Sequence, residues 1–264
     1  MPDSVSVARP LPRRDRLAIL TGLGGITLLA WLYLVYTARQ MTTMPGMPDM
    51  PDMVMLRSWT AADFLLMFLM WAVMMVGMMA PPAAPMTLVY AAIARRAAGQ
   101  DSPLPPAAVF VSGYVAMWTL FSVVATLLQA ALERAALLSS MMVSTSPILG
   151  AGILIAAGVY QFTPLKESCL RHCRTPAEFF SGHWRAGVAG AFRMGFVYGA
   201  YCLGCCGFLM LLLFLGGVMN LLWIAAIAIF IFAEKLSPLA NRGGRIAGFA
   251  MILLGILALT RFSL

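Results

Sequence analysis

Long apolar runs recur from one end of the sequence to the other, and they restrict its fold more than any other feature. Several reach the ~20 residues that a helix needs to cross the hydrocarbon core of a bilayer. Because a segment in lipid must satisfy its backbone hydrogen bonds internally, an all-α fold follows. The composition agrees, with 61% hydrophobic and only 11% charged residues. The runs expected to form membrane helices are residues 17–36, 61–80, 107–131, 148–162, 187–217, 221–232 and 246–260.

We therefore predict a polytopic transmembrane helix bundle of about seven spans, or six if one of the short runs, 148–162 and 221–232, does not cross. The lipid bilayer is then the first partner of the protein. The chain divides into a basic amino terminus (1–16), a first membrane helix (17–37), a Met-rich loop (38–60) and the rest of the bundle (61–264).

Lysine and arginine are distributed unevenly between the two sides of this arrangement. One side holds most of the 18 basic residues, whereas the other has only Arg39, Arg57, Arg134 and Arg261. Because connections rich in Lys and Arg remain in the cytoplasm, we expect a cytoplasmic amino terminus and a multi-pass protein of the bacterial inner membrane. The net charge of +8 reflects this orientation, so no nucleic-acid role is expected.

The run 187–217 contains three of the five cysteines, Cys202, Cys205 and Cys206. At ~100° per residue, their sulfurs share one face of a helix. Thiolates bind Cu(I), zinc and iron–sulfur clusters, and this spacing leaves one position for a ligand from elsewhere. A buried cysteine is also a small hydrophobic residue that packs well. Three on one face favour a metal site.

A regular methionine repeat precedes the second run. Methionine occurs at positions 41, 44, 47, 50 and 53 of a segment interrupted by Pro and Gly, which excludes a continuous helix. Exposed thioethers are soft ligands that, unlike thiolates, survive an oxidising compartment. A linker with incidental methionines is the alternative. We predict that metal is collected outside the membrane by Met44, Met47, Met50 and Met53.

Methionines continue along the second run. An acid and four thioethers fall within roughly 80° of one helix face, and prolines at 81, 82 and 85 then break or kink the helix. Such a stripe serves packing as readily as coordination. Counted along the helices, the methionine stripe and the three cysteines lie at a similar depth, near the middle of the membrane. A site shared between the second and fifth spans is therefore geometrically allowed. The stripe residues are Asp63, Met67, Met70, Met74 and Met78.

The connection before residue 187 holds the remaining cysteines, Cys169 and Cys173, one helical turn apart. His172 or His183 would complete a trigonal or tetrahedral site with them. The charge distribution places this connection in the cytoplasm, where thiols stay reduced, and a structural role fits the spacing equally well. Glu234 and Lys235 close the run 221–232 and are interpreted as a structural anchor at its cytoplasmic end.

Several of these residues recur as a set in one known family. They are Met70-Trp71, Met74-Met75, Met78-Met79, Pro81 to Pro85, Gly113-Tyr114, Trp118, Pro164-Leu165-Lys166, Cys169, Cys173, Tyr201-Cys202, Gly204-Cys205-Cys206, Met210, Gly217, Met219-Asn220, Trp223, Glu234-Lys235 and Pro238. Over residues 61–238 the chain resembles the prokaryotic predicted metal-binding integral membrane proteins. It departs from them at Gly77, Pro82, Gly207 and Ile224, and none of these departures removes a sulfur. The resemblance implies a membrane fold and a soft metal.

The sequence predicts a binding protein and no enzyme, because it lacks a nucleotide-binding loop and the HExxH and GxSxG motifs. We expect Cu(I) as the ligand, with zinc as a second fit, in copper acquisition, transfer or delivery. The corresponding partner is a copper-dependent membrane enzyme or a periplasmic copper chaperone. Two alternatives stay open: a membrane thiol-disulfide oxidoreductase that reduces quinone, and a structural or assembly subunit of a membrane complex.

Overall fold

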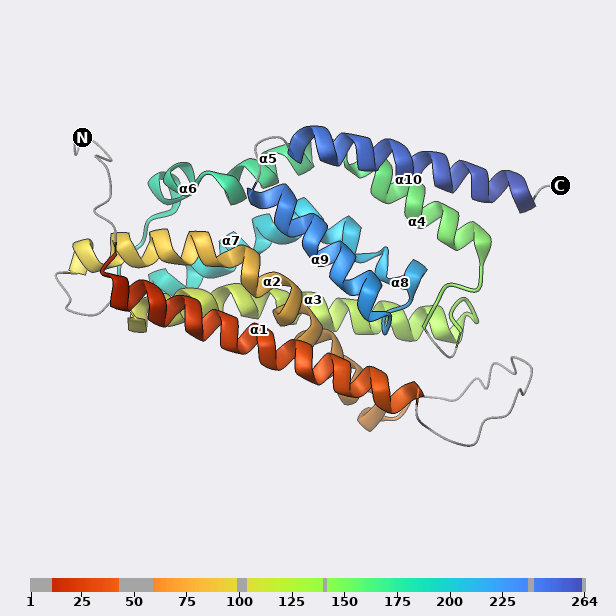
Figure 1. Ribbon diagram of the computed structural model, residues 1–264, viewed down its shortest axis with the longest axis horizontal. Helices are drawn as coiled ribbons and strands as arrows, with labels where there is room; N and C mark the ends of the chain where they lie inside the picture. Colours follow the sequence, from red (N-terminus) through yellow and green to blue (C-terminus); the bar gives the residue numbers. More distant parts are fainter. Residues whose placement is uncertain (1–10, 43–58, 99–103, 140–141, 237–239, 263–264) are drawn as a thin grey trace.

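The computed structural model describes residues 11–42, 59–98, 104–139, 142–236 and 240–262. These residues form α-helices throughout and no β-strand beyond one isolated bridge between Leu138 and Ser144, which confirms the all-α prediction for the described part. The helices are α1 (Arg13–Thr42), α2 (Ala61–Ala98), α3 (Leu104–Arg134), α4 (Pro147–Tyr160), α5 (Pro164–Arg174), α6 (Pro176–His183), α7 (Gly187–Met210), α8 (Leu213–Gly216), α9 (Leu221–Leu236) and α10 (Ala240–Phe262). Figure 1 shows the long helices packed side by side in one bundle.

Five described segments are long and apolar enough to cross a membrane: Arg13–Gln40, Ala61–Arg96, Pro106–Arg134, Gly187–Gly216 and Arg242–Arg261. A sixth span results if α4 and α5, which meet at a bend of 64°, act as one broken span. At ~1.5 Å per residue, α4 alone is shorter than the ~30 Å core of a bilayer, and so is α9. In the described part of the chain, five helices could therefore cross a membrane, or six with the bent pair, and a seventh span at α9 stays a prediction.

The second predicted helix is longer than its apolar run. α2 continues through Pro81, Pro82 and Pro85 as one helix, and it bends part-way along its length (Figure 1). A proline in a helix removes one backbone donor and clashes with the preceding turn, which accounts for a bend. The prolines thus kink this helix and do not end it.

Glycines bring α3 and α7 into close contact. A Cβ atom on Gly195 would lie 2.8 Å from the Phe110 carbonyl carbon and closer still to its oxygen, and Gly113 meets the backbone of Phe192 in the same way. Small residues allow membrane helices to approach until their backbones touch. Buried positions recur every three or four residues along α7 and continue into its cysteines. This helix pair is the frame that holds the site.

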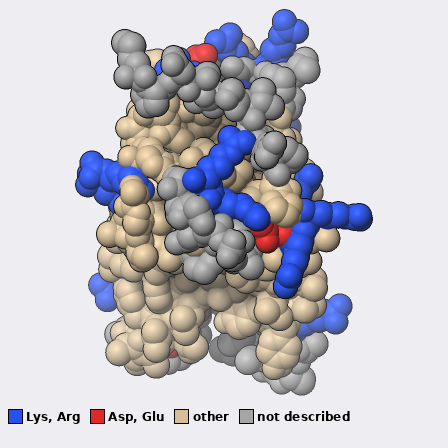
Figure 2. Space-filling view, turned by 90° about the vertical axis from the view of Figure 1, so that its left-hand side faces the viewer, with Lys and Arg blue, Asp and Glu red and all other residues tan. Residues whose placement is uncertain are grey.

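The outside of the bundle is largely apolar. Large hydrophobic side chains such as Leu29 on α1, Leu222 on α9 and Phe249 on α10 are exposed. Figure 2 views the end of the bundle at which α1 begins, and Lys and Arg side chains project from it beside the broad tan surface of other residues. An exposed apolar surface of this extent suits lipid better than water.

Candidate metal centre

Helix α7 buries its three cysteines together. Cys202, Cys205 and Cys206 are 0%, 2% and 1% exposed. The thiols of Cys205 and Cys206 each donate a hydrogen bond to the Cys202 carbonyl oxygen, at 3.0 Å. This is the local bonding expected for residues three and four positions apart on a helix. The structure thus brings the three predicted ligands to one buried face.

Helix α5 adds its cysteines to the same place. The sulfurs of Cys173 and Cys205 lie 4.0 Å apart, although 32 residues separate them in the chain. Cys169 lies against Gly204, where a Cβ atom would stand 2.6 Å from its sulfur, so glycine permits the contact. All five cysteines are buried and free. The two cysteine groups form one thiol cluster, a question that the sequence left open.

Cys202 has two further polar partners, on α3 and α9. Its sulfur lies 3.1 Å from the Tyr114 hydroxyl oxygen and accepts a hydrogen bond from the Lys235 ammonium at 2.6 Å. The Tyr114 hydroxyl also donates to the carbonyl oxygen of Met79 on α2, at 3.0 Å. Tyr114 and Lys235 are both buried. Three helices, α3, α7 and α9, therefore meet at one sulfur, and Tyr114 connects it to α2.

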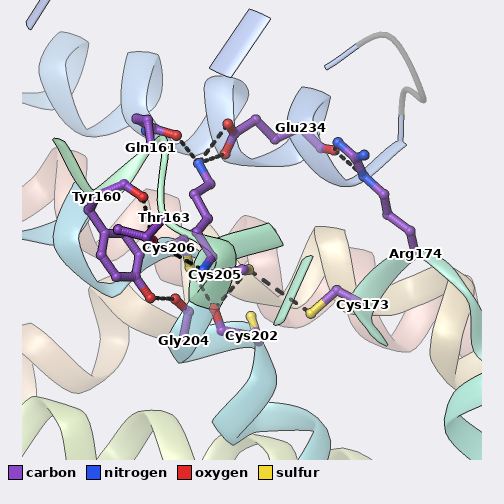
Figure 3. Close-up of polar contacts among 11 residues, drawn as sticks. Tyr160, Gln161, Thr163, Cys173, Arg174, Cys202, Gly204, Cys205, Cys206 and Glu234 are labelled. Carbon is purple, nitrogen blue, oxygen red and sulfur yellow. Dashed lines mark hydrogen bonds and ion pairs between the residues drawn. The ribbon is translucent and has the colours of Figure 1, made fainter. Parts of the chain in front are cut away.

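A buried ion pair fastens α5 to the end of α9, as Figure 3 shows. The Lys166 ammonium lies 2.7 Å from one oxygen of the Glu234 carboxylate and 2.9 Å from the other, and it also contacts the side-chain oxygen of Gln161. Arg174 donates from its Nε to the Glu234 carbonyl oxygen at 2.8 Å. A cavity of about 40 Å³ adjoins this ion pair. The helix that carries Cys169 and Cys173 is thus attached at both ends.

The methionines of α2 belong to the same buried core as the cysteines. Met70, Met74 and Met78 are core residues, but α2 packs mainly on α1 and α3, whereas α7 packs mainly on α3 and α5. Among the described residues, Tyr114 connects α2 to the thiol cluster. Its hydroxyl contacts both the backbone of α2 and the sulfur of Cys202. The predicted site shared between thioethers and thiols stays a prediction.

The outer part of the predicted stripe has other partners. The Asp63 carboxylate accepts hydrogen bonds from the backbone and hydroxyl of Thr60, so it caps the start of α2. The sulfur of half-buried Met67 lies 3.7 Å from the side-chain nitrogen of Gln129, which also donates to Glu133. Met44, Met47, Met50 and Met53 fall outside the described residues.

Both histidine rings stack on aromatic side chains. The His172 ring stacks on Tyr201 with centroids 4.3 Å apart, and its Nδ1 lies 2.9 Å from the Ser168 carbonyl oxygen. His183 stacks on Phe179 in a similar way. Among the described residues, no group of three or more Cys, His, Asp or Glu side chains is already arranged around a metal position. The thiols instead form hydrogen bonds with one another and with the Cys202 carbonyl oxygen.

The separation of one thiol pair, Cys173 and Cys205, is compatible with a shared metal ion. With metal–sulfur bonds of ~2.3 Å, a sulfur separation of 4.0 Å corresponds to an angle of about 120° at the metal, which is trigonal. Soft thiolate donors in a dry, apolar setting suit Cu(I). The cluster therefore has suitable donor atoms, and one pair of them, Cys173 and Cys205, is separated as in a metal site.

Comparison with known families identifies the chain. A family model described as PpoB2, copper chaperone, matches residues 68–258. The protein belongs to this copper chaperone family. The PpoB2 match begins in α2, ends in α10 and includes all five cysteines. No curated protein and no solved structure matches the chain. The family supports the copper part of the predicted function, whereas the resemblance to the predicted metal-binding integral membrane proteins stays a prediction.

Sequence reasoning missed two neighbours of the thiol cluster. Lys235 was interpreted as an anchor, but its amine points inward to Cys202, and Tyr114 entered only through the family resemblance. The signal for Lys235 is that it follows an almost wholly apolar helical run, where an ionisable side chain is unusual. Nothing in the sequence indicated that Glu234 would pair with Lys166, since 68 residues separate them.

Proposed function

We propose that the protein is an integral membrane copper chaperone that holds Cu(I) as cargo in its thiol cluster and passes it to a partner. The observation that carries this proposal is the convergence of Cys173 from α5 with the α7 cysteines at a metal-compatible sulfur separation of 4.0 Å. The copper chaperone family of the chain and the apolar outside of the bundle support it. The partner is a copper-dependent membrane enzyme or a periplasmic copper chaperone.

In this proposal each part of the chain has a separate task. Cys202, Cys205 and Cys206 present sulfurs from a rigid helix, and Cys173 supplies a further one from α5. Thioethers bind Cu(I) more weakly than thiolates do, so the Met-rich segment and the α2 stripe serve as a relay in which each transfer leads to softer, anionic ligands. The buried, apolar surroundings exclude water from the thiolate ligands. The amino terminus lies in the cytoplasm of a bacterium and the Met-rich segment outside its inner membrane.

The protein purified from copper-supplemented cells should contain Cu(I) with sulfur ligands. Changing Cys202, Cys205 and Cys206 together to Ser should abolish the copper, because hydroxyl groups are hard donors with a far higher pKa than thiols. Cys173→Ser should weaken binding by about tenfold or more, the loss typical of even an outer-shell partner. Metal analysis and copper X-ray absorption spectroscopy measure both effects.

Cys169→Ser is the matched control, since it lies on the same helix but contacts Gly204. It should reduce copper binding less than Cys173→Ser does. An absorption spectrum with only oxygen and nitrogen ligands, or unchanged copper in the triple variant, would contradict the proposal. A redox-active disulfide in place of bound metal would instead favour the thiol-disulfide oxidoreductase.

The relay makes its own prediction. Replacing Met41, Met44, Met47, Met50, Met53 and Met55 by Leu keeps their bulk and removes the sulfur lone pairs. Copper loading at limiting metal should then slow, while the amount bound at saturation should stay the same, because the thiol cluster decides the capacity. Time-resolved uptake of Cu(I) by protein in vesicles tests this. Identical uptake rates in the Leu variant and the parent protein would mean that the segment is only a linker.

A further inference from the structure

Lys235 places a positive charge inside the thiol cluster. Its side chain lies near the end of α9, the residue is 7% exposed, and its Nζ lies 2.6 Å from the sulfur of Cys202. Within the described part of the chain, that sulfur is the hydrogen-bond partner of the amine. The neighbouring carboxylate of Glu234 pairs with Lys166 instead. Among the described side chains, Lys235 is thus a buried cation that has no carboxylate as its hydrogen-bond partner.

Such a residue is costly for the fold. A charge removed from water needs a charged partner or strong hydrogen bonds, and an ammonium has three hydrogens to donate. A lysine at the end of a membrane helix usually extends its amine to the interface, but this one points into the bundle. Ionisable groups held inside a membrane are generally retained for function.

The missing negative charge appears when the cluster holds its cargo. One Cu(I) ion and two thiolates carry a net charge of −1, and a third thiolate makes it −2. An ammonium next to Cys202 would neutralise one unit of this charge in a setting of low dielectric, where charges interact strongly. Because an ammonium has no lone pair, Lys235 cannot itself be a ligand.

We propose that Lys235 is the counter-ion of the metal–thiolate complex and determines how tightly the thiol cluster holds Cu(I). This inference rests on the proposed function. Lys235 would act on the bound copper through the sulfur of Cys202. The uncharged Tyr114 hydroxyl is a second contact of the same sulfur. The structural anchor predicted from the sequence is thereby replaced by an electrostatic role.

The test compares Lys235→Met with Lys235→Arg in the full-length protein in detergent. Lys235→Met keeps the length and removes the charge, and it should weaken Cu(I) binding roughly ten- to a hundredfold, as expected for the loss of an opposite charge at this distance. Lys235→Arg should keep most of the affinity. Competition with a chromogenic Cu(I) chelator measures the affinity. Arg193→Met, which removes an exposed cation from α7, is the control and should bind as the parent does.

Thermal unfolding of the metal-free proteins separates this role from simple packing. Replacing an unpaired buried ammonium by an apolar side chain should leave the metal-free Tm unchanged or raise it, while copper affinity falls. Equal affinity in Lys235→Met and the parent would overturn the inference. So would a fall of both the affinity and the metal-free Tm that Lys235→Arg does not rescue, since that pattern indicates packing. A parent protein that binds no Cu(I) would instead overturn the proposed function.

Discussion

Gly195→Ala should leave little folded protein. The new methyl group would stand 2.8 Å from the Phe110 carbonyl carbon and closer to its oxygen, and a backbone group cannot move aside without moving α3. Overpacking of a buried contact destabilises proteins by about 1–3 kcal/mol, and more where the backbone itself is in the way. The yield of monodisperse protein in detergent and its Tm measure the loss.

Gly152→Ala is the matched control, because a Cβ atom at this position of α4 meets nothing within 4 Å. It should be neutral or stabilising, since alanine is favoured over glycine in a helix interior by about 1 kcal/mol. If both variants gave the same yield and Tm, the close contact between α3 and α7 would be wrong.

Lys166→Met should be the most damaging change outside the glycine contacts. It leaves the Glu234 carboxylate buried without its cation, and the side chains of this ion pair are each only 4% exposed. Removing one partner of a buried pair costs about 3–5 kcal/mol. Because the pair fastens α5 to α9, α5 should loosen, and Cys169 and Cys173 should react faster with a maleimide. Thermal unfolding and the rate of thiol labelling record the two effects.

A double change provides the internal check on this prediction. Lys166→Met combined with Glu234→Gln removes both charges, so it should recover a large part of the stability that Lys166→Met loses. Arg171→Met is the surface control. The ion pair of Arg171 with Glu178 is exposed, and its loss should cost no more than about 1 kcal/mol. Equal losses from the buried and exposed pairs would refute the attachment of α5 through Lys166.

The sequence allowed the helices to be predicted well, because each long apolar run carries its own signal. The face shared by Cys202, Cys205 and Cys206 follows from helical periodicity alone, and the structure buries all three. The end of the run 148–162 also had a readable signal. Thr163 and Pro164 form the start of a new helix, with the Thr163 side chain accepting from the backbone of Lys166. The connection after that run, in which Cys169 and Cys173 were expected one helical turn apart, contains α5 and α6.

Contacts between distant parts of the chain could not be read in this way. The meeting of Cys173 with Cys205 depends on α5 folding back along α7, which no local pattern encodes. The proposed site between the second and fifth spans relied on equal depth in the bilayer. Depth alone does not show which helices are neighbours, and α2 packs mainly on α1 and α3. The inward direction of Lys235 likewise depends on the rotation of α9.

The division of the sulfurs between two helices has a consequence for the order in which copper would leave. α7 is held against α3 by backbone contact, whereas α5 is an 11-residue helix held by the side-chain contacts of Lys166 and Arg174. An incoming ligand would therefore displace the sulfur of Cys173 before any sulfur of α7. Copper would pass by associative exchange, with the new bond forming while two old ones still hold the ion. A membrane protein built in this way could hand over its cargo without ever releasing a free ion.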